Sequence, residues 1–163
     1  MSTQSAQPDL KPWLDRAVAL ATENVADGGG PFGAVIVRDG SELISVGVNR
    51  VTRDFDPTAH AEVVAIREAC RKLSSFTLDG CVLVTSCEPC PLCLAAALWS
   101  RVDQVVYAAD RYDAAAAGFD DLAFYKLFES PRDTWTVPVA HLSVEAHNAP
   151  FDAWTANPAR VEY

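Results

Sequence analysis

The sequence is poor in basic residues and has no long hydrophobic run. Its 163 residues include 13 Lys and Arg against 22 Asp and Glu, which gives a net charge of −9. Proteins that grip nucleic acids carry basic stripes, so a nucleic-acid partner is not expected. No run reaches the roughly 18 apolar residues that a membrane-spanning helix needs, so a membrane partner is not expected either.

The cysteine content and the N-terminus bear on the cellular compartment. Five cysteines, an odd number, favour free thiols and metal ligands over a disulfide framework. Residues 1–9 are polar and lack the apolar stretch of a secretion signal, so we expect a disordered leader there and a cytoplasmic protein. Half of the residues are hydrophobic, which suffices for one core, and we expect a single domain over residues 10–163.

Hydrophobic periodicity predicts an α/β fold. Helical spacing of apolar residues predicts helices over 11–26, from Thr58 to Leu73, over 91–99 and over 121–128. Short apolar runs predict strands over 32–37, 43–48, 81–85 and 102–108, with a weaker edge strand over 134–144. The expected architecture has three layers, α-β-α, with helices on both faces of a mixed, roughly five-stranded sheet.

The pairing of the strands follows from their connections. Asp39-Gly40 is a hairpin signal, so the first two strands should be antiparallel. The strand, helix, strand order after Cys81 implies a parallel pair. The run from Ala114 to Ala117, followed by Gly118, fits either a short helix with a glycine stop or a lid of small residues.

Two cysteines and a histidine have the spacing of metal ligands. Cys90 and Cys93 are separated by two residues at the start of a predicted helix and can point at one ion, and His60 supplies a third donor. Three protein ligands leave a position for water, whose pKa a metal lowers toward neutrality. The alternatives are plain buried or redox-active thiols, and a closed structural site in which Cys87 is the fourth ligand.

Glu62 stands two residues after His60. It is either an ordinary surface carboxylate or a base that takes a proton from the bound water and passes it to a ring nitrogen and then to a departing amine. Residues two apart on a helix differ in direction by about 200°, so these two side chains can serve one centre only if the end of the helix faces it. His-Xaa-Glu followed by Pro-Cys-Xaa-Xaa-Cys is the motif of the zinc nucleobase deaminases.

Two further residues are candidates for substrate contact. Asn49 ends the predicted second strand and is either a turn residue or a group whose amide orients a substrate carbonyl or ring nitrogen. Phe32 follows the glycine run and is either a core residue or a pocket wall that stacks on a flat ring.

Longer blocks of the sequence resemble the bacterial guanine deaminases of the cytidine deaminase fold. The blocks are Gly30–Val37, Asp56–Val63, Thr85–Pro91 and Ala117–Asp121, and the similarity continues to Tyr163. The resemblance implies one zinc ion per subunit, held by His60, Cys90 and Cys93.

The same resemblance implies roles for other residues. It implies that Glu62 is the proton shuttle and that Asp121 is a second catalytic carboxylate, with Asp120 as the alternative. We also expect substrate contacts from Phe32, Ala61 and Asp120. The resemblance implies that Asn49 contacts the purine and that Tyr163 reaches a pocket. It also implies homodimers whose subunits exchange the C-terminal segment, residues 145–163.

The expected function is therefore the zinc-dependent hydrolytic deamination of guanine to xanthine and ammonia. A small-molecule purine as partner agrees with the acidic composition. The alternative enzymes act on guanosine or on another aminated ring such as cytosine. The non-enzymatic alternative is a zinc-stabilised binding module with a closed site at Cys87, Cys90, Cys93 and His60.

Overall fold

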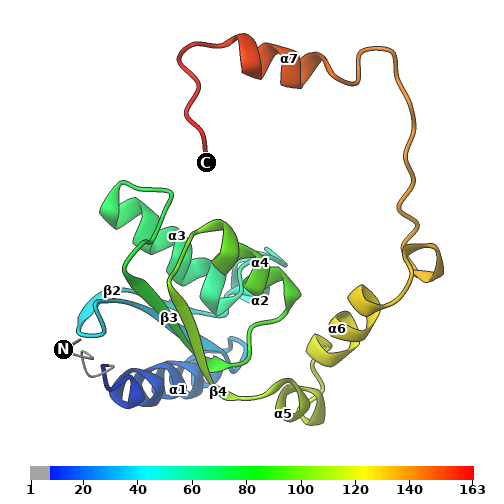
Figure 1. The fold of residues 1–163 in the computed structure, drawn as a ribbon. Coiled ribbons are helices and arrows are strands. Elements are labelled where there is room, and N and C mark those ends of the chain that lie inside the picture. The colour runs from blue at the N-terminus through cyan, green and yellow to red at the C-terminus, as the bar shows by residue number, and fades with distance from the viewer. Residues whose placement is uncertain (1–7) are drawn as a thin grey trace, which may run out of the picture. The chain divides into compact units, whose positions relative to one another are not determined.

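The computed structural model describes residues 8–163 (Figure 1), so the expected leader lies outside the described residues except for Pro8 and Asp9. The strands are β1 (Gly33–Arg38), β2 (Glu42–Val48), β3 (Cys81–Cys87) and β4 (Gln104–Ala109). The helices are α1 (Lys11–Ala26), α2 (Val51–Asp54), α3 (Ala61–Leu73), α4 (Pro91–Trp99), α5 (Arg111–Ala116), α6 (Asp121–Glu129), the 3-10 turn η1 (Arg132–Thr134) and α7 (Ala149–Ala156).

The four strands form one mixed sheet in the order β2-β1-β3-β4. Strand β1 pairs antiparallel with β2 and with β3, and β3 pairs parallel with β4. The predicted antiparallel first pair and the predicted parallel pair are both confirmed. All seven residues of β3 are buried, as expected for a strand that has neighbours on both edges and helices on both faces.

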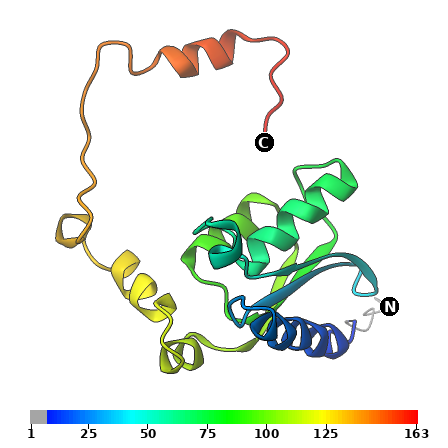
Figure 2. The ribbon, with the colours of Figure 1, turned by 180° about the vertical axis from the view of Figure 1, so that it is seen from behind.

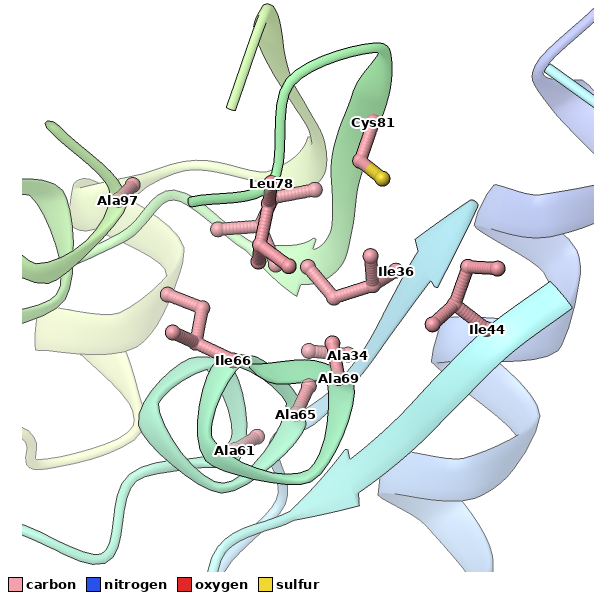
Figure 3. Packing of buried hydrophobic residues seen from close by; sticks show 11 residues of the cluster. Ala34, Ile36, Ile44, Ala61, Ala65, Ile66, Ala69, Leu78, Cys81 and Ala97 are labelled. Carbon is pink, nitrogen blue, oxygen red and sulfur yellow. The ribbon is translucent and has the colours of Figure 1, made fainter. Parts of the chain in front are cut away.

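Helices cover both faces of this sheet, as predicted (Figures 1 and 2). On one face, residues of α1 such as Leu20 pack with Val35, Val37, Val82 and Val84. On the other face, α3 and α4 pack over a cluster shown in Figure 3, whose members include Ala34, Ile36, Ile44, Ala61, Ala65, Ile66, Ala69, Leu83 and Ala97. Strands β1 and β3 thus supply alternate side chains to two separate apolar layers.

Two glycines set how closely the helices approach the sheet. A Cβ on Gly33 would collide with the backbone of α1 at Ala17 and Ala21. A Cβ on Gly47 would collide with the backbone of α3 at Ala61 and Ala65. The approach at Gly47 matters for function, because Ala61 is the first residue of the helix that follows His60.

The expected fifth strand over 134–144 is wrong, because the sheet formed by residues 8–163 has four strands. The described chain there forms η1 and then runs without regular structure to a turn that precedes α7. Pro138 cannot donate to a strand ladder, and Val137, Val139 and Leu142 are exposed. A strand needs a partner whose hydrogen-bonding groups it satisfies, and alternation of apolar residues does not supply one.

Several segments were ambiguous or missed. The alanine run is a helix, α5, and Gly118 follows it with a φ of +93°, the left-handed conformation of a glycine stop. The short helices α2 and α7 were not predicted. Within residues 8–163, no helix is both long enough and apolar enough to cross a bilayer.

The chain divides into two compact units, the first ending at Lys126 and the second spanning Leu127–Tyr163. The first unit holds the sheet and helices α1 to α5. The expectation of a single domain over residues 10–163, with residues 145–163 exchanged between subunits, stays a prediction.

The close approach at Gly47 predicts a large effect of a small substitution. We expect Gly47→Ala to lower the free energy of unfolding by about 1–3 kcal/mol, because the new methyl group must push α3 off the sheet. Urea denaturation followed by circular dichroism measures this. The neighbouring Val46→Thr, at an exposed position of β2, should change it by less than about 0.5 kcal/mol. Equal effects of the two substitutions would contradict the close-packing explanation.

Candidate metal centre and substrate cavity

The three predicted metal ligands lie at the N-terminal ends of two helices. His60 is the residue that precedes α3, and Cys90 is the residue that precedes α4, with Pro91 as the first residue of that helix. Both have extended backbones, and neither side chain caps its own helix. The first amide groups of each helix, and the positive end of its dipole, therefore face the same region as the ligands.

Three donor atoms meet at this point. The Nδ1 atom of His60 is 3.5 Å from the Sγ atom of Cys90 and 3.3 Å from that of Cys93, and the two Sγ atoms are 3.6 Å apart. Ligands on a tetrahedral zinc ion, at about 2.0–2.3 Å from the metal, are about 3.5–3.8 Å from one another. One imidazole and two thiolates are also ligands that zinc prefers. The donor set fits zinc in its chemistry and its spacing.

The ionisation of the two thiols agrees with a cation site. Their mutual hydrogen bond lowers the pKa of Cys90 to about 4, and the same bond and burial raise the pKa of Cys93. The pair on its own thus holds one proton between two sulfur atoms. A divalent cation releases that proton, because both sulfur atoms must be thiolates to serve as ligands.

Cys87 lies outside the group of donors. The group that can hold a metal ion, within the described residues, consists of His60, Cys90 and Cys93. The thiol of Cys87 donates instead to the backbone carbonyl oxygen of Asp110, at 3.6 Å. Burial raises the pKa of Cys87 to about 12, so it remains a thiol. This arrangement has three protein ligands, which a catalytic site requires and a closed structural site does not have.

Glu62 is a buried carboxylate beside the donors. It is the second residue of α3 and is 6% exposed. Burial raises its pKa to about 7, although hydrogen bonds from its own backbone amide and from Cys93 act to lower that pKa. A carboxyl group with a pKa near 7 both accepts and donates a proton at neutral pH, which is what a proton shuttle requires.

A cavity of about 240 Å³ opens beside the metal ligands. Of the predicted site residues, the cavity is lined by Phe32, Asn49, His60, Glu62, Cys90 and Asp121. Burial raises the pKa of Asp121, the first residue of α6. The structure thus brings together, from five separate stretches of the sequence, the residues that the motif and the resemblance single out.

Asn49 is held in place through its backbone and its side chain. Its backbone N–H donates to the carbonyl oxygen of Phe32 at 3.1 Å, and its own carbonyl oxygen accepts from Nδ2 of the buried Asn24 at 2.9 Å. Its Oδ1 accepts from the backbone N–H of Val51 at 3.2 Å. With Oδ1 engaged, the group that Asn49 offers to a ligand is Nδ2, a donor.

Phe32 belongs both to the core and to the wall of the cavity. It packs against the core cluster under α3, and it also lines the cavity. Its ring lies edge-on to that of Phe119, with centroids 4.8 Å apart and planes at 80°. The two rings form an aromatic wall of the cavity.

The remaining predicted site residues do not line the cavity, although Cys93 belongs to the donor group beside it. Ala61 and Cys93 are fully buried and do not line the cavity, and neither does Asp120. Tyr163 belongs to the second unit, where its ring centroid is 6.3 Å from that of Trp154. The roles predicted for Ala61, Asp120 and Tyr163 stay predictions.

The sequence interpretation missed several lining residues, namely Gly30, Val51, Thr52, Glu88 and Phe119. The positions of two of them in the sequence could have marked them as site residues. Glu88 lies inside the cysteine motif, and Phe119 lies between the glycine stop and the predicted Asp121. No feature of the sequence marked Thr52, because it belongs to the unpredicted helix α2.

Comparisons with known proteins agree with this geometry. Residues 8–109 match the family described as the cytidine and deoxycytidylate deaminase zinc-binding region. The chain is 52% identical, over 152 residues, to the guanine deaminase of Bacillus subtilis, covering 93% of this chain and 97% of that protein.

Solved structures give the same picture. A crystal structure of guanine deaminase from Bacillus subtilis superposes with a TM-score of 0.89 at 51% identity, covering 94% of this chain and 98% of that chain. A structure of guanine deaminase from Nitrosomonas europaea has a TM-score of 0.66 at 36% identity, covering 72% of this chain and 68% of that chain.

The three-donor group predicts which thiols zinc depends on. We expect Cys93→Ser to reduce the zinc content of the purified protein from about one ion per chain to below about one tenth, because a serine hydroxyl is not a thiolate. Elemental analysis by mass spectrometry measures this. Cys87→Ser is the matched control and should keep its zinc. If Cys87→Ser loses zinc to the same extent, the site is closed and has four protein ligands.

Proposed function

We infer that this chain, which belongs to the cytidine and deoxycytidylate deaminase family, is a zinc-dependent enzyme that hydrolyses guanine to xanthine and ammonia. The observation that carries the inference is the position of Glu62: a buried carboxyl group with a pKa of about 7 lines the same cavity as His60 and Cys90. A structural zinc site has no use for such a group.

We propose the metal ligands and the proton path as follows. His60, Cys90 and Cys93 hold the ion, and zinc, when bound, supplies the Lewis acidity that makes water a nucleophile near neutral pH. Glu62 accepts one proton from the attacking water and delivers it to the ring nitrogen, and it then transfers the second proton of that water to the exocyclic amine. The carbon–nitrogen bond breaks, the amine leaves as ammonia, and the water oxygen remains on the ring as the new carbonyl of xanthine.

The walls of the cavity suit a flat purine. Phe32 and Phe119 present aromatic surface to a ring, and Nδ2 of Asn49 can donate to a ring nitrogen or carbonyl oxygen. We propose Asp121, which lines the cavity and whose pKa is raised by burial, as a second carboxyl group for the leaving amine. The cavity of about 240 Å³ is smaller than the roughly 300–1,000 Å³ of common ligand sites, which favours a free base over a nucleoside.

The function is tested by release of ammonia from a panel of substrates. We expect turnover of guanine to exceed that of guanosine, cytosine and adenine by at least about 100-fold, because none of these presents the same edge in the same volume. We expect Glu62→Gln, which keeps the volume and the hydrogen bonding but cannot carry a proton, to lower kcat by about 10²–10⁴-fold.

Controls separate this mechanism from its rivals. The Glu62→Gln variant should keep its zinc, and Glu68→Gln, an exposed position on the same helix, should keep full activity. Activity that survives Glu62→Gln would contradict the proton path, and preference for guanosine or cytosine would contradict the assigned substrate.

We also propose a cytoplasmic homodimer in which residues 145–163 are exchanged between subunits and Tyr163 enters a substrate cavity. The support is that α7, in the second unit, buries none of its residues, and that Phe151 and Trp154 are 69% and 41% exposed. Large apolar side chains without cover are typical of an interface.

Light scattering tests the assembly. We expect a mass about twice the 17.6 kDa of one chain at micromolar concentration. The double substitution Phe151→Ser and Trp154→Ser should shift the protein toward the monomer. A monomeric wild-type protein under these conditions would rule the dimer out.

A further inference from the structure

Arg111 joins the metal-binding stretch to the segment that closes the cavity. It is the first residue of α5, and its guanidinium group makes a two-point contact with the carboxylate of Glu88: Nε donates to Oε2 at 2.9 Å and Nη2 to Oε1 at 2.5 Å. Its backbone N–H donates to the same carboxylate at 3.0 Å. Glu88 lines the cavity and lies two residues before the ligand Cys90.

Tyr125, on helix α6, makes a second contact with the metal-binding stretch, at Pro89. The guanidinium carbon of Arg111 lies 3.4 Å from the ring centroid of Tyr125, on α6. The hydroxyl group of Tyr125 donates to the carbonyl oxygen of Pro89 at 2.6 Å. Glu88 and Pro89, which directly precede Cys90, are therefore both held by side chains that come from α5 and α6. We call Glu88, Pro89, Arg111 and Tyr125 the clamp.

Apart from the ring contact between Phe119 and Phe32, few other contacts hold the segment that carries Phe119 and Asp121. Helix α6, all of which is described, buries none of its residues. Yet α6 begins with Asp121, and the turn before it carries Phe119; both line the cavity. A helix without a buried face takes its position from specific contacts, and the clamp supplies such contacts on the side of the metal ligands.

The ordinary explanation is a surface ion pair with no role in catalysis, since exposed pairs contribute about 0–1 kcal/mol. Three features separate Arg111 from that class. Its contact is two-pronged, its guanidinium stacks on an aromatic ring, and the side chain of its partner Glu88 is only 12% exposed. Arg111 also balances the charge of Glu88 in a cavity that already holds Glu62 and Asp121.

We propose, on the basis of the deamination proposed above, that Arg111 and Tyr125 are positioning residues. They fix the start of α6 against the Cys87–Cys90 stretch and so hold Asp121 and Phe119 at the distance from the metal ligands that the reaction needs. Misplacement of such groups by about 1 Å lowers rates by up to about 100-fold.

The experiment compares two conservative substitutions with a surface control. Arg111→Lys keeps the charge but loses the two-pronged contact, and Tyr125→Phe keeps the stacked ring but loses the bond to Pro89. We expect each to lower kcat for guanine by about 10-fold, with a smaller change in KM and with zinc content unchanged. The double variant should lose little more than either single variant, because both act through one contact network. Arg71→Gln, which breaks the exposed pair with Glu68, should change nothing.

A readout independent of turnover is amide hydrogen exchange. In both variants we expect exchange over residues 119–125 to be faster by about 10-fold, while exchange in β1 and β3 stays at the wild-type rate. If kcat and exchange in both variants equal those of the wild type, the clamp has no positioning role. Faster exchange with unchanged kcat also overturns the proposal, because the clamp is then structural only.

The two inferences fail separately. If the wild-type protein does not release ammonia from guanine, the proposed function is wrong, and the clamp is then judged by the same comparison of kcat and hydrogen exchange on whichever substrate of the panel the wild type deaminates. If the wild type is active and the variants match it, only the positioning role is wrong.

Discussion

The site depends on the convergence of two helix N-termini at one edge of a sheet. His60 precedes α3 and Cys90 precedes α4, so each donor projects from the end of a helix instead of from its side. Both helix dipoles then favour negative charge at the same place, which stabilises thiolates before any metal arrives. The convergence itself depends on packing: α3 reaches the sheet only because Gly47 has no side chain, and α3 and α4 meet through Val63, Cys90 and Cys93.

The electrostatics of the cavity follow from this arrangement. The cysteine and carboxyl side chains lie in a small volume, so a negative charge on one of them raises the pKa of the others. Glu62 has a pKa of about 7 chiefly because it is buried, whereas the charge of Glu88 is balanced by Arg111. Two carboxyl groups that line the same cavity thus differ: burial brings the pKa of Glu62 near neutrality, whereas the bond to Arg111 lowers the pKa of Glu88 and favours its charged form.

The sequence revealed the metal site better than the walls of the cavity. Donor spacing is local, so His60, Cys90 and Cys93 could be identified as a group, and the angle between His60 and Glu62 correctly required that the helix end face the site. The presence of Phe119 and Thr52 in the cavity wall depends on how distant segments pack, and the spacing of residues in the sequence does not predict such packing. The false fifth strand over 134–144 came from alternation of apolar residues, which shows a preference but not a partner for the backbone hydrogen bonds.

The metal donors and the walls of the cavity come from different kinds of structure, and this affects how readily the protein can acquire a new specificity. The donors sit on helix ends that the core fixes, whereas Thr52 and Phe119 lie on α2 and on the segment between Gly118 and α6, outside the apolar layers. We expect substitutions of Thr52 and Phe119 to alter which ring is accepted while the metal donors keep their positions. The fold therefore separates reactivity from selectivity, and a library confined to these wall positions is a direct route to deaminases of other heterocycles.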